Sequence, residues 1–176
     1  MNTKTKNIAL RYLLWVLVVA VMIFIFIHSA QNAKQSSETS GELVKTVLTV
    51  VVKDFQSLPE PEQQQAVDSL QFIVRKSAHF CIYLALGFLC FLAMNTYNIK
   101  KKTKILTSLT ISLLYAISDE IHQIFVPGRA GQVRDVLIDF SGSLTGVVFA
   151  LILIAIISKI VKKKEEVSYE EERAYK

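Results

Sequence analysis

The strongest indication of the fold lies in the stretch RKSAHFCIYLALGFLCFLAMNTY, residues 75–97. It begins with basic and titratable side chains and continues as an apolar run of roughly 20 residues, the length that a helix needs to cross the hydrocarbon core of a membrane. Three further apolar segments lie at about residues 10–27, 105–124 and 135–158, and the second span itself covers about 77–97. Backbone groups in lipid must be hydrogen-bonded internally. The sequence therefore predicts an all-α membrane protein, a bundle of four transmembrane helices.

The composition agrees with a membrane protein of one domain. Hydrophobic residues make up 52% of the 176 positions and the mean hydropathy is +0.39. The four spans, a polar segment at about 33–76 and a charged tail at 159–176 use the whole of residues 1–176. We therefore expect a single membrane domain and no second one.

Lysine and arginine residues predict the orientation. They precede the first span, fill the turn between the second and third at 100–104, and follow the fourth at 159–164. Such flanks belong on the cytoplasmic side, so both termini are expected there. His28 stands where a signal-peptide cut would need a small residue, so the first span is expected to remain as an anchor. The net charge of +5 comes from these flanks and predicts no nucleic-acid partner.

The segment between the first two spans is predicted to be helical and to lie outside. Apolar residues recur in it at spacings of three and four, typical of an amphipathic helix on the outer leaflet or over the bundle: Leu43, Val44, Val47, Leu48, Val51 and Phe55. Residues 57–60 resemble a capping box that begins a second helix. A lid over a substrate and a plain surface hairpin are both open interpretations.

Ionisable residues cluster at one end of the predicted bundle. With alternating spans, the end of the first, the start of the second, the end of the third and the start of the fourth share one membrane face. The polar residues there are His28, Arg75, Lys76, His79, Asp119, Glu120, His122, Arg129, Arg134, Asp135 and Asp139. Charges in or beside a span are costly unless they are paired or used. The pattern predicts a polar cleft that opens to the outside.

The residue types in this cleft suggest chemistry on a phosphate. Guanidinium groups match phosphate oxygens, and a histidine titrates near neutral pH. The expected catalytic residues are His79, Asp119, Glu120 and Asp139. The expected substrate-binding residues are Arg75, Lys76, Tyr83, Gln123, Arg129, Arg134 and Asp135.

Two other roles for these residues stay open. A divalent metal is one candidate cofactor, with His79, Asp119, Glu120 and His122 as candidate ligands, although their spacing matches no established metal motif. Alternatively, Asp135 and Asp139 form purely structural ion pairs with arginines.

Deeper in the fourth span, Gly142, Gly146 and Ala150 share a face with both aspartates, so a neighbouring helix is expected to approach closely there.

The chain resembles the VanZ-like family over nearly its whole length. The resemblance rests on four blocks in order, with Ser29-Ala30-Gln31 through Ser36-Ser37 before them: RKSAHF at 75–80 with Tyr83 and Gly87, SDEIHQ at 118–123, FVPGR at 125–129, and DVLID at 135–139 with Gly142 and Gly146. It implies a multi-pass protein of the bacterial plasma membrane, within the cell envelope. The namesake of the family gives low-level resistance to teicoplanin, a glycopeptide antibiotic. The resemblance supplies no reaction.

Three classes of function follow. The preferred hypothesis is an enzyme that acts on a phosphate-bearing membrane lipid or lipid-linked cell-wall precursor at the outer leaflet. The alternative is a protein that binds or shields such lipids or the antibiotic target. A transporter ranks last, because the inner halves of the spans offer only serine and threonine hydroxyls such as those of Ser108 and Ser112.

Overall fold

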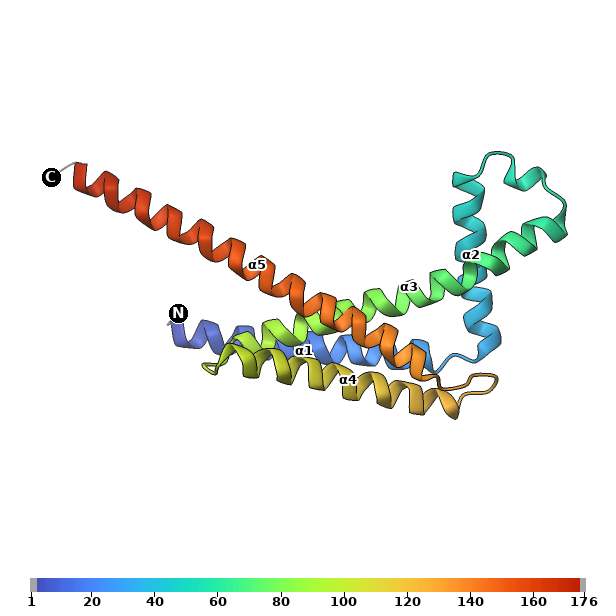
Figure 1. Ribbon diagram of the computed structural model, residues 1–176, viewed down its shortest axis with the longest axis horizontal. Coiled ribbons are helices and arrows are strands. Elements are labelled where there is room, and N and C mark those ends of the chain that lie inside the picture. Colours follow the sequence, from blue (N-terminus) through green and yellow to red (C-terminus); the bar gives the residue numbers. More distant parts are fainter. Residues whose placement is uncertain (1–2, 175–176) are drawn as a thin grey trace.

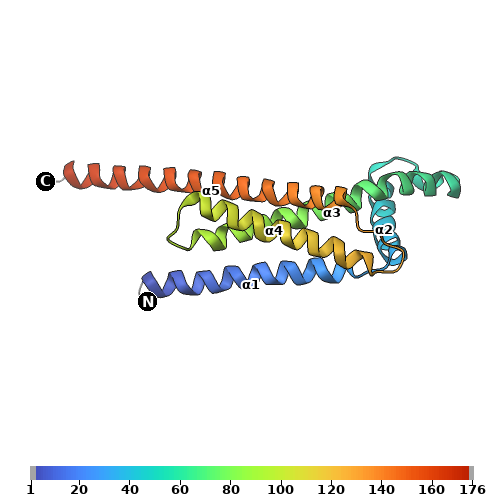
Figure 2. The same ribbon diagram turned by 60° about the horizontal axis from the view of Figure 1, so that its bottom comes forward.

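The computed structural model describes residues 3–174, and helices are its only regular elements. They are α1 (Thr3–Ser29), α2 (Ala33–Val51), a short 3-10 helix η1 (Phe55–Ser57), α3 (Glu60–Asn95), α4 (Lys101–Ile124) and α5 (Val133–Ala174). Helices α1, α3, α4 and α5 form a bundle, and α2 runs across one end of it (Figures 1 and 2). The prediction of an all-helical protein is confirmed.

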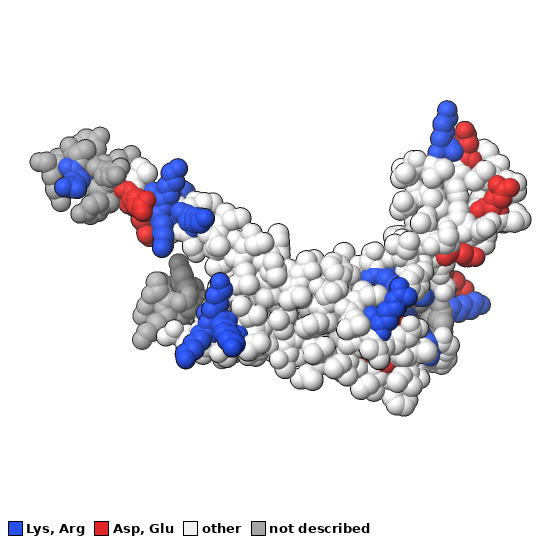
Figure 3. All heavy atoms as spheres, viewed as in Figure 1, with Lys and Arg blue, Asp and Glu red and all other residues white. Residues whose placement is uncertain are grey.

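Three helices are long and apolar enough to cross a membrane: Ile8–Ser29, Glu60–Asn95 and Val133–Val167. Their outer faces carry large apolar side chains such as Phe24, Ile27 and Phe149, about half exposed. Figure 3 shows a wide band of the bundle without charged side chains on the face drawn. Apolar groups outside and polar groups inside are what lipid requires of a helical bundle. The chain is a membrane protein. A fourth crossing, through the more polar α4, stays a prediction.

Helices α3 and α5 touch through their backbones. A Cβ atom added to Gly146 would lie 2.0 Å from the carbonyl oxygen of Leu84, and one added to Gly87 would lie 2.2 Å from that of Ser143. Gly142 is equally close to Phe80, at 2.4 Å from its carbonyl oxygen. The small residues of α5 therefore do allow the close approach that the sequence predicted.

Polar contacts join α1 to the far end of α3. Arg11 donates from Nε to the Thr96 hydroxyl (3.1 Å) and stacks over the ring of Tyr97. The indole N–H of Trp15 donates to the Tyr97 hydroxyl (3.1 Å). Together with the apolar core around Val18 and Leu86, these contacts fix α1 against α3.

The predicted outer helix is α2, and the capping box in this segment lies at a different place from the one expected. A capping box forms at its start, where Asn32 accepts from the Gln35 backbone N–H (2.8 Å) and the Gln35 side chain accepts in return. The one expected at 57–60 does not form, because Ser57 belongs to η1 and Pro59, which precedes α3, makes no side-chain cap.

The apolar stripe of α2 is divided between two environments. Val44 packs with Phe55 of η1 and Val67 of α3 in a small core, whereas Leu43 and Val47 are more than half exposed. The exposed part of the stripe suits contact with a lipid surface.

Substitution of Gly146 by valine tests the α3–α5 contact. Its side chain would collide with backbone atoms, so the helices must separate, at a cost of about 3 kcal/mol or more. Thr145→Val is the matched control, because Thr145 is exposed and its hydroxyl bonds only within α5, to Ser141. We expect a clear loss of thermal stability in detergent for Gly146→Val alone. Equal stability of the two variants would contradict the contact.

Candidate functional site

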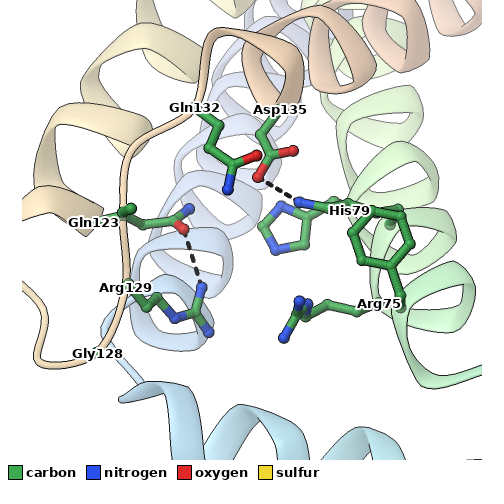
Figure 4. Close-up of a pocket in the computed structure, with 10 residues that line it drawn as sticks. Arg75, His79, Gln123, Gly128, Arg129, Gln132 and Asp135 are labelled. Carbon is green, nitrogen blue, oxygen red and sulfur yellow. Dashed lines mark hydrogen bonds and ion pairs between the residues drawn. The ribbon is translucent and has the colours of Figure 1, made fainter. Parts of the chain in front are cut away.

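Most of the polar residues that the sequence placed at one end of the bundle do meet there. α3 supplies Arg75, Lys76 and His79, α4 supplies Asp119, Glu120 and Gln123, and α5 supplies Asp135 and Asp139. The loop between α4 and α5 closes the site with Arg129 and Gln132, as Figure 4 shows. On each helix one pair of these residues is four positions apart, about one turn (Arg75 and His79, Asp119 and Gln123, Asp135 and Asp139), so the two side chains of a pair lie on the same face.

One ion pair links α3 and α5 at the rim. The ammonium of Lys76 is paired with Oδ2 of Asp135, and both side chains are largely buried. The partner of Asp135 is therefore a lysine, whereas the sequence suggested an arginine. The pair fixes the register of α3 against α5. It lies one helical turn before Asp139, the next acidic residue of α5.

Below this pair, a histidine and two carboxylates come together. His79 Nδ1 lies 3.6 Å from Oδ1 of Asp139, which is only 1% exposed. Asp119, also buried, accepts from the Ser29 hydroxyl of α1 (2.9 Å) and from the Gln123 side chain (3.3 Å). Tyr83, one turn deeper than His79 on α3, is fully buried.

Glu120, one of the predicted catalytic residues, forms hydrogen bonds through both of its carboxylate oxygens. Its Oε2 accepts from the backbone N–H of Gln132 (2.9 Å) and its Oε1 from Gln123 Nε2 (3.1 Å). A Cβ atom on Gly131 would lie 2.7 Å from the Glu120 carbonyl oxygen. Oε2 of Glu120 thus holds the α4–α5 loop over the site, while Oε1 is engaged by Gln123 of α4 itself.

A polar cavity of about 150 Å³ opens above the cluster. Arg75 and Arg129 extend into it toward one another (Figure 4), and His79, 22% exposed, forms part of its wall. Arg129 donates to the side-chain oxygen of Gln123 (3.1 Å). Over residues 3–174, neither arginine forms a salt bridge with a carboxylate. Burial lowers the pKa of Arg129, and the positive charge of Arg75 lowers it further. Two cationic groups therefore share a cavity, and among the described residues no carboxylate lies within salt-bridge distance of either.

An apolar groove of about 220 Å³ adjoins the polar cavity. It lies between α1, α2 and α3, and Arg75, His79 and Arg129 line both spaces. The other walls are mainly apolar and include Phe24, Ile25, Leu43, Val74, Ala78 and Ile82.

Two predicted site residues lie apart from the cavity. Arg134 is exposed and stacks over the ring of Phe72, 5.5 Å from its centroid. His122 packs its ring against Phe26 (4.6 Å between centroids) and does not join the group around His79.

Sequence reasoning about the cleft missed Ser29 and Gln132. Ser29 is a small polar residue at the end of the first span, on the predicted outer side, and that position was the available signal. Gln132 acts through its backbone, which no side-chain pattern reveals.

Comparison with known proteins identifies the family. A family model described as VanZ/LLP1 matches residues 14–155. Because this covers most of the chain, the protein belongs to that family, as the sequence motifs predicted. Neither the curated proteins nor the solved structures that were searched contain a match to it.

The Lys76–Asp135 pair is predicted to be structural. Lys76→Met leaves a largely buried carboxylate without its cation and should lower the free energy of unfolding by about 2–4 kcal/mol. The double variant Lys76→Met/Asp135→Asn removes both charges and should recover most of that loss. Thermal unfolding in detergent measures both. A double variant no more stable than the single one would contradict this role.

Proposed function

We propose that this VanZ/LLP1 family protein binds the phosphate-bearing head group of an envelope lipid or lipid-linked wall precursor and carries out acid–base chemistry on it. The observation that carries the proposal is the pair of adjoining spaces, one cationic and one apolar, that share Arg75, His79 and Arg129. A lipid has the same division, an anionic head beside a hydrocarbon tail.

The two arginines support a phosphate ligand. Their guanidinium groups point at each other across the cavity without a carboxylate partner among the described residues. A phosphate between them would relieve their repulsion and accept charge-assisted hydrogen bonds from both. Lys76, by contrast, is already paired with Asp135 and is less free to bind an anion.

The groove supports a hydrocarbon chain on the same ligand. Apart from His28, Arg75 and His79, its walls from α1 and α3 are apolar. Helix α2 covers it with Leu43 and with the hydroxyl residues Ser36, Thr39 and Ser40. This position favours the lid interpretation of α2 over that of a plain surface hairpin. A tail in the groove would leave the head group beside His79.

His79 is the group we assign to proton transfer. One ring nitrogen faces Asp139, which leaves the other for a ligand in the cavity. A histidine oriented by a buried carboxylate is a common general acid or base. Asp119 and Asp139 either orient the imidazole ring of His79 or bind a further positive charge.

We place the site at the outer face of the bacterial plasma membrane, with α4 as a fourth crossing and both termini inside. Lysine and arginine side chains form a group near the N-terminus and the α3–α4 turn, whereas those at the site end lie among aspartate and glutamate side chains (Figure 3). That distribution agrees with cytoplasmic flanks. Altered outer-leaflet lipids or precursors would then change susceptibility to teicoplanin-type glycopeptides.

Transport has less support. The buried hydroxyls of Ser108 and Ser112 on α4 donate to carbonyl groups of their own helix, those of Lys104 and Ser108. They are therefore already satisfied and offer no path for a polar solute.

Lipid retention tests the proposed ligand. The protein, purified in mild detergent, should keep a phosphate-bearing lipid that mass spectrometry detects. Arg75→Gln/Arg129→Gln should reduce this lipid at least about tenfold, since each charge-assisted contact contributes about 1.5–3 kcal/mol. Arg134→Gln is the matched control, because Arg134 lies outside the cavity, and should retain the lipid.

A second variant separates a lipid from a free phosphate. Ala78→Trp fills the apolar groove and should reduce retention of the lipid while leaving binding of inorganic phosphate unchanged. Equal lipid retention by the wild type and the double arginine variant would contradict the proposal.

A further inference from the structure

We propose that a divalent cation binds at the base of the polar cavity, held by His79, Asp119 and Asp139. One nitrogen of the imidazole and one oxygen of each carboxylate lie within 4.8 Å of one another. The residues come from α3, α4 and α5, so the ion would join three helices. This site differs from the ligand set that the sequence suggested, since Asp139 takes the place of Glu120 and His122.

The separations suit one ion. Ligand atoms at about 2.1 Å from a cation lie at most about 4.2 Å apart across it. Small rotations of the His79 and Asp119 side chains close the remaining few tenths of an ångström. His79 remains partly accessible from the cavity, which leaves open positions on the ion for water or an anionic ligand. With an ion bound, a metal-bound water would take over the proton transfer assigned to His79 above, because a metal-bound imidazole is no longer free to act as the base.

The negative charge of the two carboxylates is a second argument for a cation, independent of the distances between the ligand atoms. Asp139 is 1% exposed, and neither of its oxygens has a hydrogen-bond partner in the part of the chain that the structure describes. Among the described residues, the hydrogen-bond donors to Asp119, which is 4% exposed, are the neutral groups of Ser29 and Gln123. Two buried carboxylates side by side are strongly unfavourable without a counter-charge.

Apart from His79, no nearby cation among the described residues forms an ion pair with either aspartate, and Arg75 extends into the polar cavity above them. Lys76 is paired with Asp135, and the hydrogen bond of Arg129 goes to the Gln123 side chain. His79 is the cationic candidate that faces Asp139, and one imidazolium balances at most one of the two charges. A divalent ion balances both.

The surroundings of the cluster resemble the supporting shell of a metal site. The hydroxyl of Ser29 and the amide of Gln123 donate to the same oxygen of Asp119, Oδ2, and so leave Oδ1 for the ion. Such outer contacts orient ligands and raise affinity. One imidazole with two carboxylates suits Mn²⁺ or Zn²⁺ better than Ca²⁺, which prefers an all-oxygen shell.

Manganese binding to the purified full chain tests the site. Electron paramagnetic resonance of Mn²⁺, in detergent and after lipid removal, should show one saturable ion per chain. Nitrogen coupling in the pulsed spectrum should place an imidazole on the ion, and His79→Gln should abolish this coupling. Zn²⁺ should displace Mn²⁺ from the site, which metal analysis after dialysis would detect.

Matched variants separate the two ligand sets. Asp139→Asn should weaken Mn²⁺ binding by at least about tenfold. Loss of an outer-shell partner already lowers metal affinity by about that factor, and Asp139 is proposed to contact the ion directly. Glu120→Gln should change it by less than about threefold, because Glu120 bonds to the loop. Should Asp139→Asn fail to fold, the nitrogen coupling in the wild type and its loss in His79→Gln decide the matter.

Three outcomes would overturn the site. They are the absence of saturable binding of both ions to the folded wild type, a bound Mn²⁺ without nitrogen coupling, and equal affinity in the wild type and Asp139→Asn. The first would mean that the carboxylates share a proton instead. Because lipid is absent from these measurements, their result does not depend on the proposed function.

Discussion

The geometry of the site follows from the glycine-lined contact between α3 and α5. Gly87, Gly142 and Gly146 bring the two backbones so close that the helices cannot rotate independently. Directly above that contact, Lys76 meets Asp135 and His79 meets Asp139. A carboxylate as deeply buried as Asp139 is tolerable only where its neighbours are fixed, and backbone contact fixes them. The small residues and the charged ones are therefore parts of one arrangement.

The acidic and the basic groups of the site lie at different depths, and each set could bind a different ligand. Acidic groups lie deep, at Asp119 and Asp139, while two arginines without carboxylate partners lie nearer the opening. A phosphate would complete the upper part and a divalent ion the lower part. The apolar groove beneath α2 adds the place for a hydrocarbon chain. These three features together fit a phosphate-bearing lipid better than a soluble substrate.

The sequence predicted much of this arrangement, for physical reasons that also explain what it missed. Span length and the cost of charge in lipid located the helices and the residues around His79 and Asp119. The alternation of spans then placed them at one end. Which acid pairs with which base depends on the rotation of the helices, so the Lys76–Asp135 pair, the outward position of Arg134 and the separation of His122 did not follow. The loop-holding role of Glu120 depends on a backbone N–H that sequence patterns do not report.

The most direct measurement is mass spectrometry of envelope lipids and lipid-linked wall precursors. Cells that make this protein would be compared with cells that make His79→Ala at equal membrane abundance and with cells that make neither. Chemistry at the site predicts a phosphate-bearing species gained or lost only with the unmodified protein. Identical profiles in all three, with the protein folded in the membrane, would contradict catalysis and leave a protein that only binds its lipid.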